Sequence, residues 1–220
     1  MPAQAMRSPR PLNADVKHTT MKEPAEKAWE EFLNPEVLRP RLIAASLFIT
    51  SFELLKDSIV GRIRDFFCHG FDEHGDNIDP QYRAEVLARN RSPVYASLDW
   101  LVMMQAIESA DIETFDRVKA CRNHVAHRLL AIVGTDGLPP DFAERFQEMT
   151  GLLRKIEVWW IKEVDIPTSG DFDGQEIDET KIIPGPVMGL QLLCDVALGS
   201  EERSRFYYDE LRKRSAERGA

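Results

Sequence analysis

The feature that most constrains the fold is a long stretch, between residues 35 and 68, in which large apolar side chains recur every three or four positions. These side chains are Phe48, Phe52, Leu55, Ile59, Ile63 and Phe66. This spacing places them on one face of a helix. Asn34 followed by Pro35 is typical of a helix start, because Asn caps the first turn and Pro fits its first position. We therefore expect one long helix, about 50 Å in length at 1.5 Å per residue.

Apolar residues recur at helical spacing through most of the remaining chain, and no run of convincing length alternates apolar with polar residues. We expect further helices at residues 26–33, 80–88, 92–109, 111–133, 140–164, 186–198 and 201–216, with a loop at 69–80 and a turn-rich acidic arm at 167–186. The sequence therefore predicts an all-α fold. An up-and-down helical bundle spans residues 24–165, after a disordered basic tail (1–23) and before an extension (166–220), in which the acidic arm and C-terminal helices pack on the bundle.

Size and charge limit the classes of function. The chain has 220 residues, of which 43% are hydrophobic, and this is enough for one good core. Its formal net charge is -9. An acidic chain repels nucleic acid at long range, which argues against a general RNA-coating protein and leaves a local basic site open.

Three further features concern the compartment. No stretch approaches 18 uncharged apolar residues, and the N-terminus lacks the apolar run of a secretory leader. Cys68, Cys121 and Cys194 are widely spaced and form no CxxC pair, which favours a reducing compartment. We therefore expect a cytoplasmic protein with no membrane partner.

The expected helix at 111–133 carries an arginine where an apolar residue belongs. One side of this helix collects Ile112, Phe115, Val118, Val125, Leu129, Ile132 and Val133. Arg122 lies near the middle of that stripe. Because burial of an unpaired charge is costly, Arg122 must either pair with an acid or face a cleft. Glu53 and Asp57, on a polar stripe of the long helix, are candidates to pair with Arg122 or to tune a nearby histidine; a solvated polar face is the alternative.

Asn123 and His127 lie four residues apart on the face beside this stripe and are therefore neighbours. We expect the amide of Asn123 to orient the imidazole of His127 through a hydrogen bond. His124 projects to the far, solvent-facing side of the helix.

Acidic residues and histidines also crowd the loop at 69–80. They are His69, Asp72, His74, Asp76 and Asp79. Their spacing matches no metal-ligand pattern, and in particular lacks the regular spacing and closing Glu of a calcium loop. We expect a solvated acidic loop and no metal. No glycine-rich phosphate loop is present, so no nucleotide cofactor is expected either.

Arg122-Asn123-x-x-x-His127 resembles the Arg-x(4–6)-His signature of the HEPN family in its RNxxxH form. The surroundings are similar too: a long amphipathic helix comes first, then "SPVYASLDWLVMMQAI", then an acidic turn and "FDRVKACRNHVAHRLL". The resemblance covers roughly residues 35–165. It implies a helical bundle that dimerises, in a family with many metal-independent endoribonucleases of toxin–antitoxin, abortive-infection, CRISPR and stress systems. The resemblance makes Arg122 and His127 the catalytic residues and Asn123 their support.

The residue types suit this chemistry. RNA carries its own nucleophile, the 2′-hydroxyl, so a histidine that titrates near neutral pH and a charged guanidinium are sufficient to move a proton and to stabilise a phosphate. The products would be a 2′,3′-cyclic phosphate and a 5′-hydroxyl. Expected partners are RNA, a second copy of the chain, for which the small Ala120 and Ala126 leave room, and an antitoxin or other protein.

Two further features concern the function and its control. The net acidity favours an alternative, a non-catalytic HEPN-like module for dimerisation or RNA binding. In some HEPN toxins a partner enzyme modifies a tyrosine two residues after the histidine. Leu129 occupies that position here, so control by modification at that site is not expected.

Overall fold

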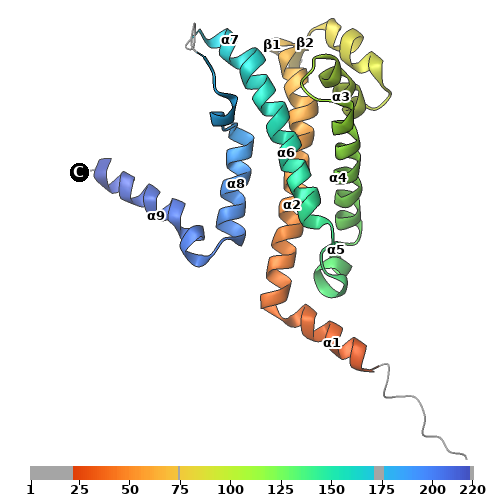
Figure 1. The fold of residues 1–220 in the computed structure, drawn as a ribbon, viewed down its shortest axis with the longest axis vertical. Coiled ribbons are helices and arrows are strands. Elements are labelled where there is room, and N and C mark those ends of the chain that lie inside the picture. The colour runs from red at the N-terminus through yellow and green to blue at the C-terminus, as the bar shows by residue number, and fades with distance from the viewer. Residues whose placement is uncertain (1–21, 74, 171–175, 219–220) are drawn as a thin grey trace, which may run out of the picture.

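Three long helices lie side by side and alternate in direction: α2 (Pro35–Phe66), α4 (Ser109–His127) and α6 (Phe142–Trp160) (Figure 1). The computed structural model describes residues 22–73, 75–170 and 176–218. The other helices are α1 (Lys22–Leu33), α3 (Pro93–Met103), α5 (Leu129–Ala131), α7 (Ile166–Ser169), α8 (Gly185–Leu198) and α9 (Glu201–Arg218). The prediction of a mostly helical chain is confirmed.

The long helix α2 begins where its sequence predicts. The Asn34 side chain accepts a hydrogen bond from the backbone N–H of Glu36, 3.0 Å away, and Pro35 occupies the first position. Pro40 lies inside the helix and removes one backbone donor, yet the helix continues to Phe66.

The core fills the space between α2, α4 and α6. Phe52 of α2 stacks on Phe115 of α4, with 5.7 Å between ring centroids, and both side chains are buried. At the other end of the bundle, Trp100 of α3 stacks on Trp160 of α6 at 6.0 Å. Helix α8 packs against α2 and α6 and contributes the buried Leu190, so it shares this core.

The loop predicted at 69–80 is instead a short antiparallel hairpin, β1 (Cys68–Asp72) paired with β2 (Gly75–Ile78). Gly70 and Gly75 take positive φ values there, a conformation that costs glycine little. Nearly all of the hairpin is exposed, so its strands carry no alternating apolar pattern. Its acids pair with cations, as in Arg64–Asp76 at 2.7 Å. His74 lies outside the described residues, and within those described no three His, Cys, Asp or Glu side chains gather to hold a metal.

The helix predicted over residues 111–133 ends earlier, at His127. The backbone of Arg128 leaves the helical region (φ -114°, ψ 20°), and its guanidinium pairs with Asp136 at 2.8 Å. After α5, a π-helical turn over Ile132–Asp136 brings Ile132 and Val133 into the core. Apolar spacing continues across the break, which is why the periodicity predicts one helix. Helix α3 also ends early, at Met103, and Gln105 follows with a positive φ of 61°.

The remaining segments lie around the bundle. Further π-helical turns span Tyr82–Val86 and Ile161–Asp165, and short 3₁₀ turns span Leu87–Arg89 and Glu179–Lys181. Over residues 201–217, helix α9 contains no buried residue. Of the predicted basic tail, all but Lys22 and Glu23, the first residues of α1, lies outside the described residues. In the part of the chain that the structure describes, every helix is too short or too polar to cross a membrane.

Candidate functional site

A small pocket of about 210 Å³ opens beside Arg122, between α2, α4 and the start of α3. Its lining consists of Phe52, Glu53, Lys56, Ser92, Val94, Phe115, Lys119, Arg122 and Asn123. Three of the five residues singled out from the sequence therefore meet at one place: Glu53, Arg122 and Asn123.

Arg122 both pairs with an acid and faces the pocket. Its Nη2 lies 2.6 Å from Oε1 of Glu53, and its guanidinium carbon lies 5.3 Å from the centre of the Phe52 ring. Nη1 donates to Oδ1 of Asn123 at 3.3 Å. The Nε atom is buried and has no hydrogen-bond partner among the described residues. The guanidinium is thus held on three sides, while 30% of the side chain stays exposed.

The pocket carries a surplus of positive charge. Lys56, Lys119 and Arg122 line it, against the single carboxylate of Glu53. Lys56 Nζ lies 3.1 Å from Oε2 of Glu53, and Lys119 donates to the Tyr95 hydroxyl at 3.1 Å. Partial burial raises the pKa of Glu53, but the hydrogen bonds from Lys56 and Arg122 outweigh it and leave that pKa below its ordinary value. Glu53 is therefore ionised at neutral pH, and two positive charges remain to attract an anion.

Asp57 does not reach this site. Its carboxylate is exposed and lies back against Gly61, one turn further along α2, rather than toward α4. Among the described residues no ion pair joins Asp57 to Arg122, because Glu53 already occupies that guanidinium. Among the described residues, no contact of Asp57 supports the prediction that it acts on Arg122 or His127.

His127 lies apart from the pocket. It is the last residue of α4 and is exposed to solvent. The hydrogen bond expected from Asn123 is not formed within the described residues, because the Asn123 oxygen accepts from Arg122 instead. Five residues of helix place Arg122 and His127 about 140° apart around the axis and about 7.5 Å apart along it. Within one copy of the chain the two side chains therefore diverge.

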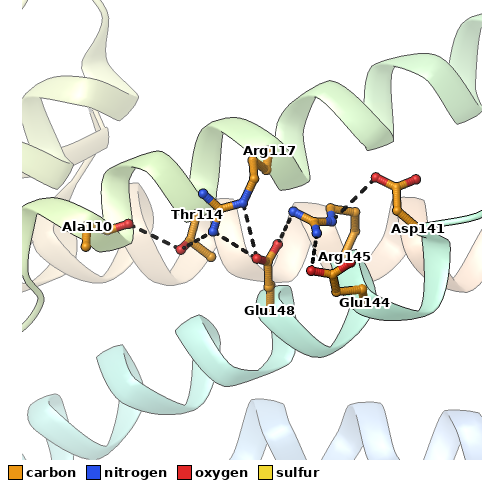
Figure 2. A network of polar contacts seen from close by, with 7 residues as sticks. All are labelled: Ala110, Thr114, Arg117, Asp141, Glu144, Arg145 and Glu148. Carbon is orange, nitrogen blue, oxygen red and sulfur yellow. Dashed lines mark hydrogen bonds and ion pairs between the residues drawn. The ribbon is translucent and has the colours of Figure 1, made fainter.

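His124 is exposed, as expected, but it also lines a groove of about 710 Å³ between α4 and the start of α6. Figure 2 shows the polar network beside that groove, which sequence reasoning missed. Arg145 is its centre and is only 7% exposed. It pairs with Glu144 at 2.5 Å, with Glu148 at 2.8 Å and with Asp141 at 3.5 Å.

Arg117 of α4 joins this network from the other side, because its Nη2 lies 2.8 Å from Oε1 of Glu148 (Figure 2). The network therefore ties α4 to α6 and holds α4 in place. The sequence did contain a signal for it. Arg145 stands four residues before the buried Met149, on the apolar stripe of α6, which is the same anomaly that marks Arg122.

Acids from elsewhere neutralise several of the basic side chains of α4 and of Arg128, which follows it. Arg117 pairs with Glu148, Arg122 with Glu53, and Arg128 with Asp136. The local surplus is thus confined to the pocket beside Arg122.

Cys121, on the buried side of α4, is not equipped to be a nucleophile. Burial, with a smaller contribution from Asp141, raises the pKa of its thiol to about 11. At pH 8 its thiolate fraction is then on the order of 100-fold smaller than that of an ordinary cysteine. We expect iodoacetamide to alkylate the less buried Cys68 well before Cys121, as read by peptide mass spectrometry. In urea the two should react alike, and equal rates in the folded protein would contradict this assignment.

Comparison of the chain with protein-family models, with curated proteins and with solved structures gives no match.

Proposed function

We propose that this chain is a metal-independent endoribonuclease of the HEPN type, acting as a toxin or phage-defence component. One observation carries the proposal: the arginine of the RNxxxH motif lies at a pocket with two surplus positive charges, on the same helix as an exposed histidine. The helical bundle is compatible with it.

The chemistry follows from these groups. The 2′-oxygen of the RNA attacks the adjacent phosphorus while a base removes its proton, and the 5′-oxygen leaves as a hydroxyl after it receives a proton. His127 is the group that moves a proton, since histidine is the side chain that most often serves as a general acid or base in enzymes. Arg122 binds the phosphate oxygens and stabilises the charge that develops on them. Lys56 and Lys119 attract the RNA backbone to the pocket.

Arg122 has to exchange Glu53 for phosphate in this scheme. The pair is partly exposed, with 30% of the arginine and 45% of the glutamate side chain accessible. Ion pairs with such exposure contribute only about 0–1 kcal/mol, so a phosphate with two further cations nearby can displace the carboxylate. Before RNA binds, Glu53 keeps the guanidinium of Arg122 in position. Asn123 accepts a hydrogen bond from the other side of that guanidinium.

A second copy of the chain is part of the proposal. Arg122 and His127 diverge within one copy, and Ala120 and Ala126 are exposed on α4. Small side chains allow a second α4 to approach closely, which would bring the histidine of one copy toward the arginine of the other. An antitoxin or another protein would hold the activity in check.

The alternative function is a non-catalytic module of the same type, for dimerisation or RNA binding. Two observations favour it: the Arg122–Glu53 pair, and the lack of any hydrogen bond that orients His127 within the described residues.

The deciding experiment incubates purified protein with mixed RNA in EDTA and analyses the new ends. Fragments that end in 2′,3′-cyclic phosphate and begin with 5′-hydroxyl support the ribonuclease. RNA that stays intact while a gel-shift assay shows binding supports the module instead. Cleavage that requires an added divalent ion would contradict the proposed mechanism.

A further inference from the structure

A larger cavity than the pocket beside Arg122 lies away from it, where the C-terminal ends of α3 and α6 meet the segment 176–183. Its volume is about 880 Å³, enough for a nucleotide and part of its neighbour. Because α4 begins at Ser109 beside it, about 20 Å of helix separate this cavity from Arg122.

Aromatic rings form one wall of the cavity. Three of the four tryptophans of the chain line it, together with Phe66: Trp100, Trp159 and Trp160. Trp160 is buried and Trp159 half-buried. The Trp159 ring meets Trp100 edge-on at 6.2 Å and Trp160 at 4.9 Å, so the two inner tryptophans brace it. A braced and partly open indole is a platform on which a planar base can stack.

Three cations and the carboxylates of Glu163 and Glu179 form the other wall. The segment 176–183, which we call the strap, binds two of these cations. Arg154 Nη2 donates to the carbonyl oxygens of Glu179, Thr180 and Ile182, at 3.4, 3.5 and 3.2 Å. Lys162 Nζ lies 2.7 Å from the Glu179 carboxylate, which raises the pKa of this lysine. The third lining cation, Lys155, pairs with Asp111 at 2.6 Å.

The strap, which forms a 3₁₀ turn over Glu179–Lys181, thus presents several carbonyl and carboxylate oxygens to Arg154 and Lys162. These oxygens occupy positions beside the two cations where phosphate oxygens would bind more strongly, since each nucleotide of a nucleic acid carries one full negative charge on its phosphate. The ion pair Lys162–Glu179 is half exposed on both sides and is therefore weak.

We propose that this cavity binds single-stranded nucleic acid, with a base stacked on Trp159 and phosphates on Lys162 and Arg154, and that the strap occupies the cation positions until the nucleic acid displaces it. The inference goes beyond the proposed function, because this cavity would bind nucleic acid whether or not the chain cleaves RNA.

The test measures tryptophan fluorescence in a Trp29→Phe background, in which all remaining tryptophans line the cavity. The probes are a short 2′-O-methyl uridine oligomer and a short thymidine oligomer. Neither has a 2′-hydroxyl nucleophile, so binding is measured whether or not the chain cleaves RNA. Both should quench the fluorescence saturably, and inorganic polyphosphate, which has no bases, should not. No quenching by either oligomer, or equal quenching by polyphosphate, overturns the inference.

Variants locate the binding. Lys162→Gln should weaken it about fivefold, whereas Lys181→Gln, an exposed lysine of the strap outside the cavity lining, should leave it unchanged. Trp159→Leu should weaken it about tenfold through lost stacking. Glu179→Gln should tighten it about threefold, because it removes the nearer of the two carboxylates that pair with Lys162. Equal affinities of Lys162→Gln and Lys181→Gln would place the oligomer elsewhere and overturn the inference, even if Trp159→Leu proved unstable.

Discussion

Replacing His127 with alanine should slow RNA cleavage by about 10²–10⁴-fold, the contribution usually made by a general acid or base. The substitution should leave the free energy of unfolding unchanged, because the side chain is exposed at the end of α4 and forms no hydrogen bond within the described residues. The measurement is the initial rate of appearance of cyclic-phosphate ends in EDTA, beside a urea titration of the same preparation.

The matched control is His124→Ala. It removes an exposed imidazole from the same helix, three residues away, on the side that lines the α4–α6 groove. Its cleavage rate should stay within about twofold of the original, since a surface substitution away from the reacting groups has little effect. Equal loss in both variants would show that the imidazole of His127 has no special role, and equal activity of His127→Ala and the unchanged protein would refute catalysis by this residue.

Replacing Phe115 with alanine should lower the free energy of unfolding by about 3–5 kcal/mol, the range for large aromatic side chains removed from a packed core. Phe115 is only 1% exposed. It stacks on Phe52 of α2 at 5.7 Å and meets Tyr95 of α3 edge-on at 6.0 Å, so its loss opens a cavity where three helices meet. Because Phe52 also lies under the Arg122 guanidinium, this change should loosen the candidate site as well.

Phe71→Ala is the corresponding control, because Phe71 lies on the β1–β2 hairpin and is 87% exposed. It should change the free energy of unfolding by less than about 0.5 kcal/mol. Chemical denaturation followed by tryptophan fluorescence gives both values. A small effect of Phe115→Ala, similar to that of Phe71→Ala, would mean that α2 and α4 do not pack through these rings.

Helical periodicity predicted the elements that share the core because their buried faces are continuous. The start of α2 at Asn34-Pro35 and the closing helices α8 and α9 are confirmed within a few residues. The hairpin was missed because its strands are exposed and short, so no alternation marks them. The break at Arg128 was missed because apolar spacing resumes after it and conceals the change of direction.

The sequence predicted those parts of the site that the pattern of a single helix reveals. Arg122 stands out because a charge on an apolar stripe is costly, and Glu53 was found with Asp57 because both share the facing stripe. Which of the two acids pairs depends on the relative height of α2 and α4, which only packing sets. The tryptophan cavity draws on α3, α6 and the strap together, and no single segment reveals such a convergence.

Helix α9 affects which part of the molecule each unfolding measurement reports. Its residues 201–217 bury no side chain, and it joins α8 through polar contacts such as Tyr207–Asp195 at 2.9 Å and Arg203–Asp195 at 3.2 Å. Isolated helices of this length are only marginally stable in water, so we expect α9 to melt locally while the bundle stays folded. Circular dichroism at helical wavelengths then declines before tryptophan fluorescence does. We therefore expect the chain as a whole to depart from two-state unfolding.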